Sequence, residues 1–388
     1  TPPSLTLVGP PTPQQGPPPY RRARPPPPGG VYPSNGGGAG APPPTDIMQI
    51  RLATPADAAA WDAYVLAHPD GSIFHLSQWQ RAIDQAFGHP HHSLLAEASG
   101  RVVGVLPLGE IDSRLFGHFL VSVPFAELGG PLVDNPEVAR QLLQRAALIG
   151  AERGCAFVEL KNKDSVAGLP TKDLYYNFSK ELLPEVAANL EAIPRKSRAA
   201  VRKGISEGLS AAFGLEQFDA FYEVMARSYH QLGTPIFPKR FFRAFLDSFG
   251  EAAEVMVVRN RDGLPIACVL TFYYRDRVMP YYAGSLWEYR QLCPNDFKYW
   301  ELMKRGCERG CKVFDYGRSK LGTGSFSFKK HWGFEPRPLA YQYQLLRAKE
   351  LPNLSPSNPK YQKKIELWRK MPLALTKIVG PPLAKYLA

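Results

Sequence analysis

One stretch of this chain occurs twice, and this repeat limits the possible folds more strongly than any other feature. Residues Glu152–Leu160 return with small changes as Glu308–Tyr316, and in both copies a helical run passes through a glycine into an apolar strand. Upstream, Ser122–Ala126 resembles Val278–Tyr282 at the same spacing. A repeat of this length is a whole domain rather than a solenoid module. We therefore expect two half-chains of one fold, with a ligand groove between them.

The beginning of the chain differs in composition from the rest. Residues 1–44 hold sixteen of the 39 prolines and eight of the 33 glycines, with almost no aliphatic run. Such a segment cannot bury enough apolar surface to offset its chain entropy, so we expect residues 1–47 to be a disordered Pro/Gly-rich extension and Met48 to be the natural start. The remainder is long enough for two cores, a first domain over 48–170 and a second over 171–346.

Positive charge is concentrated near the other end. The formal net charge is +12, and residues 341–388 contribute nine Lys/Arg against two acids. A basic chain would ordinarily favour nucleic acid as a partner, but most of this charge lies outside the folded body. Residues 347–388 form a basic amphipathic tail that prolines break into pieces too short to span a bilayer. We expect a cytoplasmic protein whose tail contacts the inner face of an anionic membrane; the alternative is an arm docked on the body.

The alternation of strands and helices predicts an α/β (α+β) fold. Each half would hold a mixed central sheet flanked by helices. In the first half, we expect one long strand over Val102–Ile111 and a helix over Pro136–Arg153. In the second half, we expect a hairpin over Val255–Tyr274 and a helix over Pro294–Arg309.

The sequence offers no metal-binding pattern. The five cysteines form no spaced pair, and Cys307 and Cys311 have no histidine partner. His89, His91 and His92 open a strand without an obvious carboxylate or cysteine companion. We expect reduced thiols and no metal.

Three motifs distinguish the second half. Phe314–Ser319 ends a strand, Gly322–Gly324 forms a short glycine loop, and Phe328–Phe334 is a helix that ends in Gly-Phe. Together with a strand over Ala340–Leu346, they resemble the closing segment of the GNAT acyltransferase fold. The duplicated pattern over residues 48–345 resembles the Fem-like (FemAB) peptidyltransferases, which are two GNAT-like domains in one chain.

This resemblance implies two tandem GNAT-like domains and a function in the cell envelope. Fem-like enzymes add amino acids to a lipid- or nucleotide-linked precursor of the bacterial cell wall. Within the family, the chain looks most like the branch associated with the exosortase and PEP-CTERM protein-sorting system. The resemblance therefore implies an acyltransferase that forms an amide on a cell-envelope or exopolysaccharide precursor.

A glycine-rich loop distinguishes between two possible acyl donors. Acetyl-CoA users hold the pyrophosphate on the backbone amides of such a loop, which opens a helix. Here the turn Ser285–Cys293 before the second-half helix contains no glycine, and Gly129-Gly130-Pro131 before the first-half helix lacks the pattern. An aminoacyl-tRNA donor fits this absence better than acyl-CoA, which remains the alternative. We expect no bound cofactor.

A basic patch precedes the second repeat. It consists of Arg195, Lys196, Arg198 and Arg202, and a helix would place the three arginines on one face. Guanidinium groups suit the phosphates of tRNA, a nucleotide sugar or a polyprenyl pyrophosphate. We expect these residues to bind substrate; the alternative is a solvated helix face.

We expect the chemistry in a cleft of the second half. Asp315, near the end of a buried strand, would accept the proton of the attacking amine or orient Arg318. Lys329 would stabilise the oxyanion, since the resemblance implies a lysine after phenylalanine at this place. Tyr282 would donate a hydrogen bond from its phenol. Two further residues would bind substrate there, Tyr281 and Ser319.

The same residues also fit roles without catalysis. Asp315 and Arg318 could form a structural ion pair, and Lys329 could be a surface lysine. No Cys–His or Ser–His–Asp arrangement is evident, so we expect direct attack without a covalent acyl-enzyme. The alternative functions are a CoA-dependent GNAT N-acyltransferase acting on an amino sugar and a non-catalytic scaffold that binds an envelope polymer.

Overall fold

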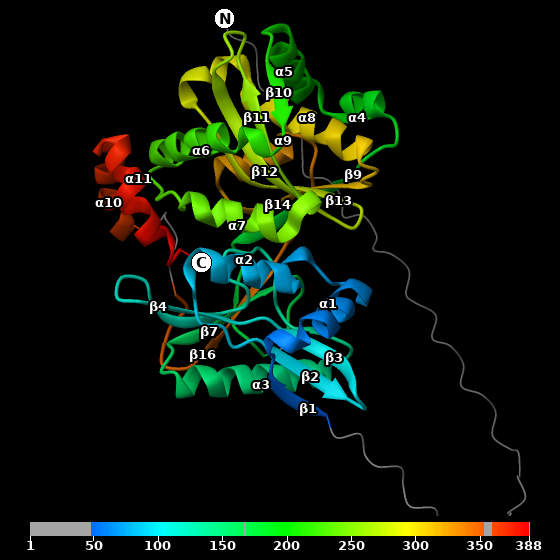
Figure 1. Cartoon of the computed structure of the whole chain (residues 1–388), viewed down its shortest axis with the longest axis vertical. Helices are drawn as coiled ribbons and strands as arrows, with labels where there is room; N and C mark the ends of the chain where they lie inside the picture. The colour runs from blue at the N-terminus through cyan, green and yellow to red at the C-terminus, as the bar shows by residue number, and fades with distance from the viewer. Residues whose placement is uncertain (1–47, 167, 353–358, 388) are drawn as a thin grey trace, which may run out of the picture. The chain divides into compact units, whose positions relative to one another are not determined.

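The computed structural model describes residues 48–166, 168–352 and 359–387. They belong to one compact unit, Asp46–Ala388 (Figure 1). The extension 1–47, which the composition predicts to be disordered, lies outside the described residues.

Among its described residues, the first half contains three α-helices and eight strands. In chain order they are β1 (Gln49–Leu52), α1 (Ala58–Ala67), α2 (Ser77–Phe87), β2 (Leu94–Ala98), β3 (Arg101–Leu106), β4 (Gly109–Ser113), β5 (Gly117–Val121), β6 (Leu132–Val133), α3 (Pro136–Glu152), β7 (Phe157–Asn162) and β8 (Thr171–Lys172), with β16 (Ala340–Leu345) added from the far end of the chain.

The second half follows from residue 175. Its elements are β9 (Tyr175–Glu181), α4 (Val186–Ala192), α5 (Arg195–Ser206), β10 (Ser210–Phe213), α6 (Phe218–Leu232), α7 (Lys239–Phe249), β11 (Ala253–Arg259), β12 (Pro265–Tyr274), β13 (Arg277–Ser285), α8 (Pro294–Glu308), β14 (Val313–Lys320), α9 (Gly324–His331) and β15 (Pro336–Pro338). The tail contains α10 (Pro359–Lys370) and α11 (Leu373–Ala384).

In the described part of the chain, the strands form three sheets. The first half has a four-stranded sheet, β1-β2-β3-β6, and a five-stranded sheet, β4-β5-β7-β16-β8. The second half has a seven-stranded sheet in the order β10-β11-β12-β13-β14-β9-β15. Pairing is antiparallel at most places and parallel between β5 and β7 and between β13 and β14. The expected α/β class with mixed sheets is confirmed.

The duplicated segments have the same structure in both halves. In the first half, β5 pairs in parallel with β7 at two positions, Leu120 with Val158 and Val121 with Glu159. In the second half, β13 pairs in parallel with β14 at two positions, which begin with Arg277 opposite Val313. Beyond these short ladders, each pair of strands separates. The strands that line both gaps, together with the loop after β5, build the candidate site below.

The single strand expected over Val102–Ile111 is wrong. The chain forms β3 in the four-stranded sheet and β4 in the five-stranded sheet, and Pro107 lies between them. Proline has no backbone N–H to donate and a fixed φ, so it interrupts a strand that apolar residues alone would extend. Gly109 then approaches the ring of Pro124 so closely that a Cβ would lie 2.3 Å from it.

The core is shared by both halves. Along β11, Val255 and Val257 pack in a cluster with α6 and α7, while Met256 and Val258 on the opposite face pack with α5 and α8. The first of these clusters also includes α2. Fully buried Trp79 of α2 lies with its ring centroid 4.6 Å from that of a phenylalanine in α7. Helices α2 and α7 therefore join the halves through apolar contact.

A strand from the end of the range 171–346 completes the first-half sheet. β16 pairs with β7 along its whole length, from Ala340 opposite Asn162 to Leu345 opposite Phe157. The closing strand therefore belongs by pairing to the five-stranded sheet, although it follows the second half in sequence.

The tail packs on the body as two helices. α10 and α11 lie beside α6, as the red helices of Figure 1 show. His230 of α6 bonds the carbonyl of Met371 at 2.9 Å, and Lys377 donates to Glu223 at 2.6 Å. The tail is therefore an arm docked on the body by one side. Within the described residues, no helix combines the length and the apolar character needed to cross a membrane.

Candidate active site

A loop with unusual backbone angles follows β5 and reaches the second half. Val123 and Phe125 have φ values of 56° and 59°, a region that non-glycine residues rarely adopt and that a β-branched side chain disfavours. Such angles persist where surrounding contacts hold them, and they cluster at functional sites. The carbonyl of Phe125 accepts a hydrogen bond from Tyr281 at 2.9 Å and one from Tyr282 at 3.5 Å. The loop is therefore fixed to β13.

The same loop carries Glu127 to the end of β14. Its Oε2 accepts a hydrogen bond from the backbone amide of Arg318 at 2.8 Å. A Cβ on Gly317 would lie 2.4 Å from the other carboxylate oxygen, so this approach requires glycine, which here has a φ of +66°. Burial raises the pKa of Glu127, while the positive charges of Lys329 and Arg318 oppose that rise.

Arg318 lies between two aromatic rings. Its guanidinium carbon is 4.5 Å from the ring centroid of Tyr175 and 5.3 Å from that of Tyr341. Nη1 also donates to the Tyr341 hydroxyl at 3.0 Å, and that hydroxyl donates to the carbonyl of Glu127. Cation–π contacts and these hydrogen bonds hold the charge in place beside Glu127.

Lys329 is buried rather than on the surface. Its Nζ donates to three backbone carbonyls of β14, those of Tyr316, Gly317 and Arg318, at 2.7, 2.9 and 3.0 Å. Burial lowers its pKa to about 8, and the carboxylates of Glu127 and Asp315 counter that effect. Because an ammonium has three donors, these bonds use all of them, and Lys329 fixes the end of β14 while adding positive charge.

The other predicted residues of the second half lie around this point. Asp315 is 9% exposed, accepts from the amide of Gly317 at 3.0 Å and pairs with Arg277 at 3.3 Å. It therefore orients the strand end and pairs with Arg277 rather than with Arg318. Tyr281 and Tyr282 have pKa values raised well above normal by burial, so they are neutral hydrogen-bond donors. Buried Ser319 has a hydroxyl without a hydrogen-bond partner among the described residues.

Two residues that sequence reasoning missed complete the cluster, Glu127 and Lys161. Lys161 is buried at the end of β7, and its Nζ donates to the carbonyl of Val123 at 3.3 Å. It interacts electrostatically with Arg318, which lowers its pKa, and with Glu127, which raises it. Burial lowers its pKa to about 8. The sequence held one sign of Lys161: it is a charged residue at the end of an apolar strand, at the position of the repeat that corresponds to Gly317 in the second copy. We name these seven residues the central cluster: Glu127, Lys161, Tyr281, Tyr282, Asp315, Arg318 and Lys329.

A small cavity of about 160 Å³ lies on the first-half side of the central cluster. Lys161 contributes to its wall, together with Gly130 and His75. The His75 ring bonds the Gly130 carbonyl at 3.0 Å, and burial lowers its pKa to about 4, so it is neutral at physiological pH. The cavity wall therefore contains Lys161, whose pKa is lowered, and the backbone of Gly130.

The predicted basic patch lies on α5 and is partly neutralised. Arg198 and Arg202 both pair with Glu191 of the preceding helix α4, the latter at 3.0 Å. Arg195 and Lys196 are exposed, and their side chains make no hydrogen bond or ion pair to any described residue. The three arginines thus do not act as equal phosphate ligands, because an acid outside the basic run occupies two of them.

A carboxylate lies in the first turn of α8, the helix before which the GNAT resemblance predicts a pyrophosphate-binding loop. Asp296, in the first turn of α8, accepts a hydrogen bond from the Trp332 indole at 2.9 Å. Burial raises its pKa, and a hydrogen bond from Trp332 opposes that rise. Where this carboxyl is ionised, it occupies the positive end of the helix and repels a phosphate there.

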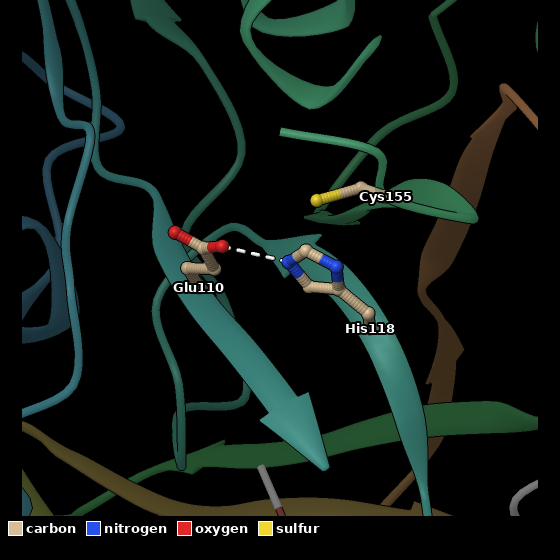
Figure 2. Close-up of side chains that lie close together, drawn as sticks. All are labelled: Glu110, His118 and Cys155. Atoms are coloured by element: carbon tan, nitrogen blue, oxygen red, sulfur yellow. Dashed lines mark hydrogen bonds and ion pairs between the residues drawn. The ribbon is translucent and has the colours of Figure 1, made fainter. Parts of the chain in front are cut away.

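Over residues 48–166, 168–352 and 359–387, one group of side chains has the right types for a metal ion. Ligand atoms of Glu110, His118 and Cys155 lie within 4.8 Å of one another (Figure 2). The carboxylate already accepts from His118 at 2.7 Å, from His92 at 2.8 Å and from the guanidinium of Arg153. Burial alone would raise the pKa of Glu110, but these hydrogen bonds lower it to about 2. A metal would have to displace the guanidinium, so we assign this group as an ion cluster that joins β4 to β5.

Comparisons with known proteins agree with this architecture. Residues 191–330 match the family described as acetyltransferase (GNAT) domain. The crystal structure of FemX is similar with a TM-score of 0.58 at 16% identity, over 81% of this chain and 99% of that one. A tandem GNAT protein from the clavulanic acid biosynthesis pathway is similar with a TM-score of 0.51 at 10% identity, over 78% and 100%.

A third similar structure is the C-terminal domain of a protein described as a putative lysylphosphatidylglycerol synthetase, from Agrobacterium fabrum. Its TM-score is 0.50 at 16% identity, over 74% of this chain and 91% of that one. Among curated proteins, no sequence matches this chain. The chain thus has the fold of two GNAT-like domains.

Proposed function

We propose that this protein is an aminoacyltransferase of the Fem type that forms an amide on a cell-envelope or exopolysaccharide precursor. The observation that carries the proposal is the contact across the halves, where the Glu127 carboxylate meets the backbone of Arg318 and the charge of Lys329. The association with exosortase and PEP-CTERM sorting is a prediction from the sequence resemblance alone.

The proposed chemistry is direct attack of an amine on an aminoacyl ester. The acceptor nitrogen forms a bond to the ester carbonyl carbon, and the bond from that carbon to the tRNA ribose oxygen breaks. Glu127 accepts the proton that the nitrogen loses, and the ribose oxygen takes a proton as it leaves. Because burial raises its pKa toward the working pH, Glu127 suits a group that must both take and return a proton.

Positive charge beside Glu127 would stabilise the negative oxygen that forms during this reaction. The tetrahedral intermediate carries a negative oxygen, which fixed positive groups in a shielded site stabilise. Arg318, held by Tyr175 and Tyr341, is the charge we assign to this role. Lys329 fixes the carbonyls of β14, and buried Ser319 offers a hydroxyl without a partner among the described residues. Lys329 therefore acts as a positioning residue.

The cavity beside Lys161 supports a small amine as the acceptor end. About 160 Å³ is less than a drug-sized ligand usually occupies, so it would admit an amine and a few attached atoms. The rest of the precursor would remain outside.

The first turn of α8 supports aminoacyl-tRNA over acyl-CoA as the donor. Asp296 occupies the position where CoA users present free amides to a pyrophosphate. A CoA-dependent N-acyltransferase remains the second candidate, because residues 191–330 match the acetyltransferase (GNAT) domain family. Exposed Arg195 and Lys196 would contact tRNA phosphates under the first proposal.

The full chain, a membrane extract and either radiolabelled aminoacyl-tRNA or radiolabelled acyl-CoA would test the proposal. Label that survives mild alkali counts new amide, because aminoacyl esters and thioesters hydrolyse. Stable label from tRNA, lost in Glu127→Gln and kept in the exposed neighbour variant Lys330→Ala, is the expected result. Stable label from acyl-CoA alone would contradict the donor. Label unaffected by both Glu127→Gln and Arg318→Gln would contradict the site.

A further inference from the structure

The outer face of α11 is apolar and exposed. The inner face packs on the body through Thr376, Gly380 and Ala384, which are buried and follow helical spacing. On the other side, Ile378 is 72% exposed, and Leu375 and Val379 are 44% and 37% exposed. A helix that is apolar on both faces is unusual in water unless its outer face meets another surface.

This apolar face continues into a groove at the C-terminal end of α11. Leu375, Val379 and Leu383 are four residues apart, so they form one row along the helix. The row ends at a groove of about 200 Å³. Its wall includes apolar residues from the β4–β5 hairpin, the end of α6 and the tail, namely Leu115, Leu232, Ile365, Leu383 and Leu387.

A buried polar group in the groove wall lacks a partner. Trp368 is 8% exposed, and its indole N–H donates to no acceptor among the described residues. Leaving such a donor unpaired is costly, so it favours a ligand that brings an oxygen to the groove. An apolar groove with one donor matches the interfacial part of a lipid, where acyl chains meet ester oxygens.

The charge around this face identifies the kind of surface. Residues 341–388 carry nine Lys/Arg against two acids. Lys363 and Lys370 lie seven apart on α10, exposed on the same helix face as Leu367, which is itself 64% exposed. Tryptophan, aliphatic residues and lysines at a helix surface suit the interface of a membrane with anionic lipids.

We propose that α10 and α11 form a docking face for an anionic lipid bilayer, with Leu375, Ile378 and Val379 inserted at the interface and one lipid chain in the groove. The proposal goes beyond the proposed function, since its observations lie entirely in the tail, the end of α6 and the β4–β5 hairpin. It would place the active site near precursors that are anchored to lipid.

Vesicle sedimentation of the full chain, without donor or acceptor, tests this face independently of catalysis. The vesicles are phosphatidylcholine alone or equal parts of phosphatidylcholine and phosphatidylglycerol. We expect binding to the anionic vesicles and about tenfold weaker binding for Ile378→Glu. The matched control is Leu148→Glu on α3, a leucine that is 50% exposed outside the tail, and it should bind like the unchanged protein.

Charge and folding are checked in the same assay. Lys363→Gln with Lys370→Gln should weaken binding to anionic vesicles several-fold and leave the weak binding to phosphatidylcholine unchanged. Thermal unfolding of Ile378→Glu should match that of the unchanged protein, because the side chain is exposed. No sedimentation with anionic vesicles, or equal losses for Ile378→Glu and Leu148→Glu, would overturn the proposal.

Discussion

The carboxylate of Glu127 and the backbone amide of Arg318 form a hydrogen bond of 2.8 Å between residues 191 positions apart in the chain. The first residue belongs to a loop of the first half, and the second lies near the C-terminal end of β14 in the second half. The two halves therefore contribute opposite charges to one site. The positive charges of Lys329 and Arg318 in the second half oppose the rise that burial causes in the pKa of Glu127 in the first half. The proposed chemistry depends on this contact.

Replacing Glu127 by glutamine should reduce the rate of amide formation by about 100-fold, because the amide cannot accept a proton. The unchanged enzyme should gain activity as pH rises through the raised pKa of Glu127, since the base works in its ionised form. Glutamine should abolish this acidic limb. Initial rates measured from pH 5 to pH 9, with Lys330→Ala as the control, would show it. An unchanged pH profile would contradict the role of Glu127 as base.

Lys161→Met should stabilise the fold at neutral pH by about 2 kcal/mol while lowering activity. Burial lowers the folded-state pKa of Lys161 from 10.5 to about 8, so burying its charged form opposes folding at pH below 8. Between pH 8 and pH 10.5 the unfolded state binds more protons, and the stability of the unchanged protein rises with pH. The advantage of the variant should therefore fade over that range. Urea unfolding at pH 7 and pH 10 measures it; an advantage that is the same at both pH values would refute this account.

Arg195→Gln and Lys196→Gln should each weaken tRNA binding about threefold at low salt, because both side chains are exposed and unpaired among the described residues. Arg202→Gln should have a smaller effect, since this arginine already pairs with Glu191. Filter binding at two salt concentrations would compare these variants with Lys312→Gln, an exposed lysine outside α5. Equal effects for all four would indicate non-specific attraction.

Gln342→Leu should destabilise the protein by about 3 kcal/mol. Gln342 is fully buried on β16, accepts from Asn162 at 2.9 Å and from the amide of Val166 at 2.7 Å, and its amide donates to neighbouring oxygens. Leucine would leave these buried partners unpaired. Gln344→Leu, on the same strand but with one hydrogen bond to Leu143, should cost less than about 1 kcal/mol. Denaturant unfolding of both variants distinguishes the two, and equal costs would refute the network.

Local chemistry made much of the fold predictable from the sequence. The hairpin over Val255–Tyr274 forms as expected around Gly263, and the repeat correctly predicts that both halves contain the same unit, which the structure shows to include one parallel strand pair in each half. Pro107 divides the expected strand Val102–Ile111 because hydrophobic pattern alone does not show where one sheet ends and another begins. The pairing of β16 with β7 joins segments too far apart for any local pattern to predict.

The candidate site was predictable on one side. Arg318, Tyr281 and Tyr282 lie near strand ends, and Lys329, which the family resemblance suggested, lies beside them on α9. Their roles remain predictions. Their partner Glu127 was not predicted because it lies in a loop that contains residues with positive φ. The path of this loop depends on contacts with the second half. Long-range electrostatic partners follow from three-dimensional packing, which residue types and spacing do not contain.

The pairing of β16, the last described strand in the chain, with β7 of the first half also sets an order of events during synthesis. β7 leaves the ribosome early, whereas the strand that covers its free edge is made only after the whole second half. At 5–20 residues per second, that delay is roughly 10–40 s. Throughout it, a nascent strand with unpaired amides and carbonyls is open to pairing with other chains. Slow translation or a shortage of chaperones should therefore harm the yield of this protein through its first half, even though the missing piece is encoded near its end.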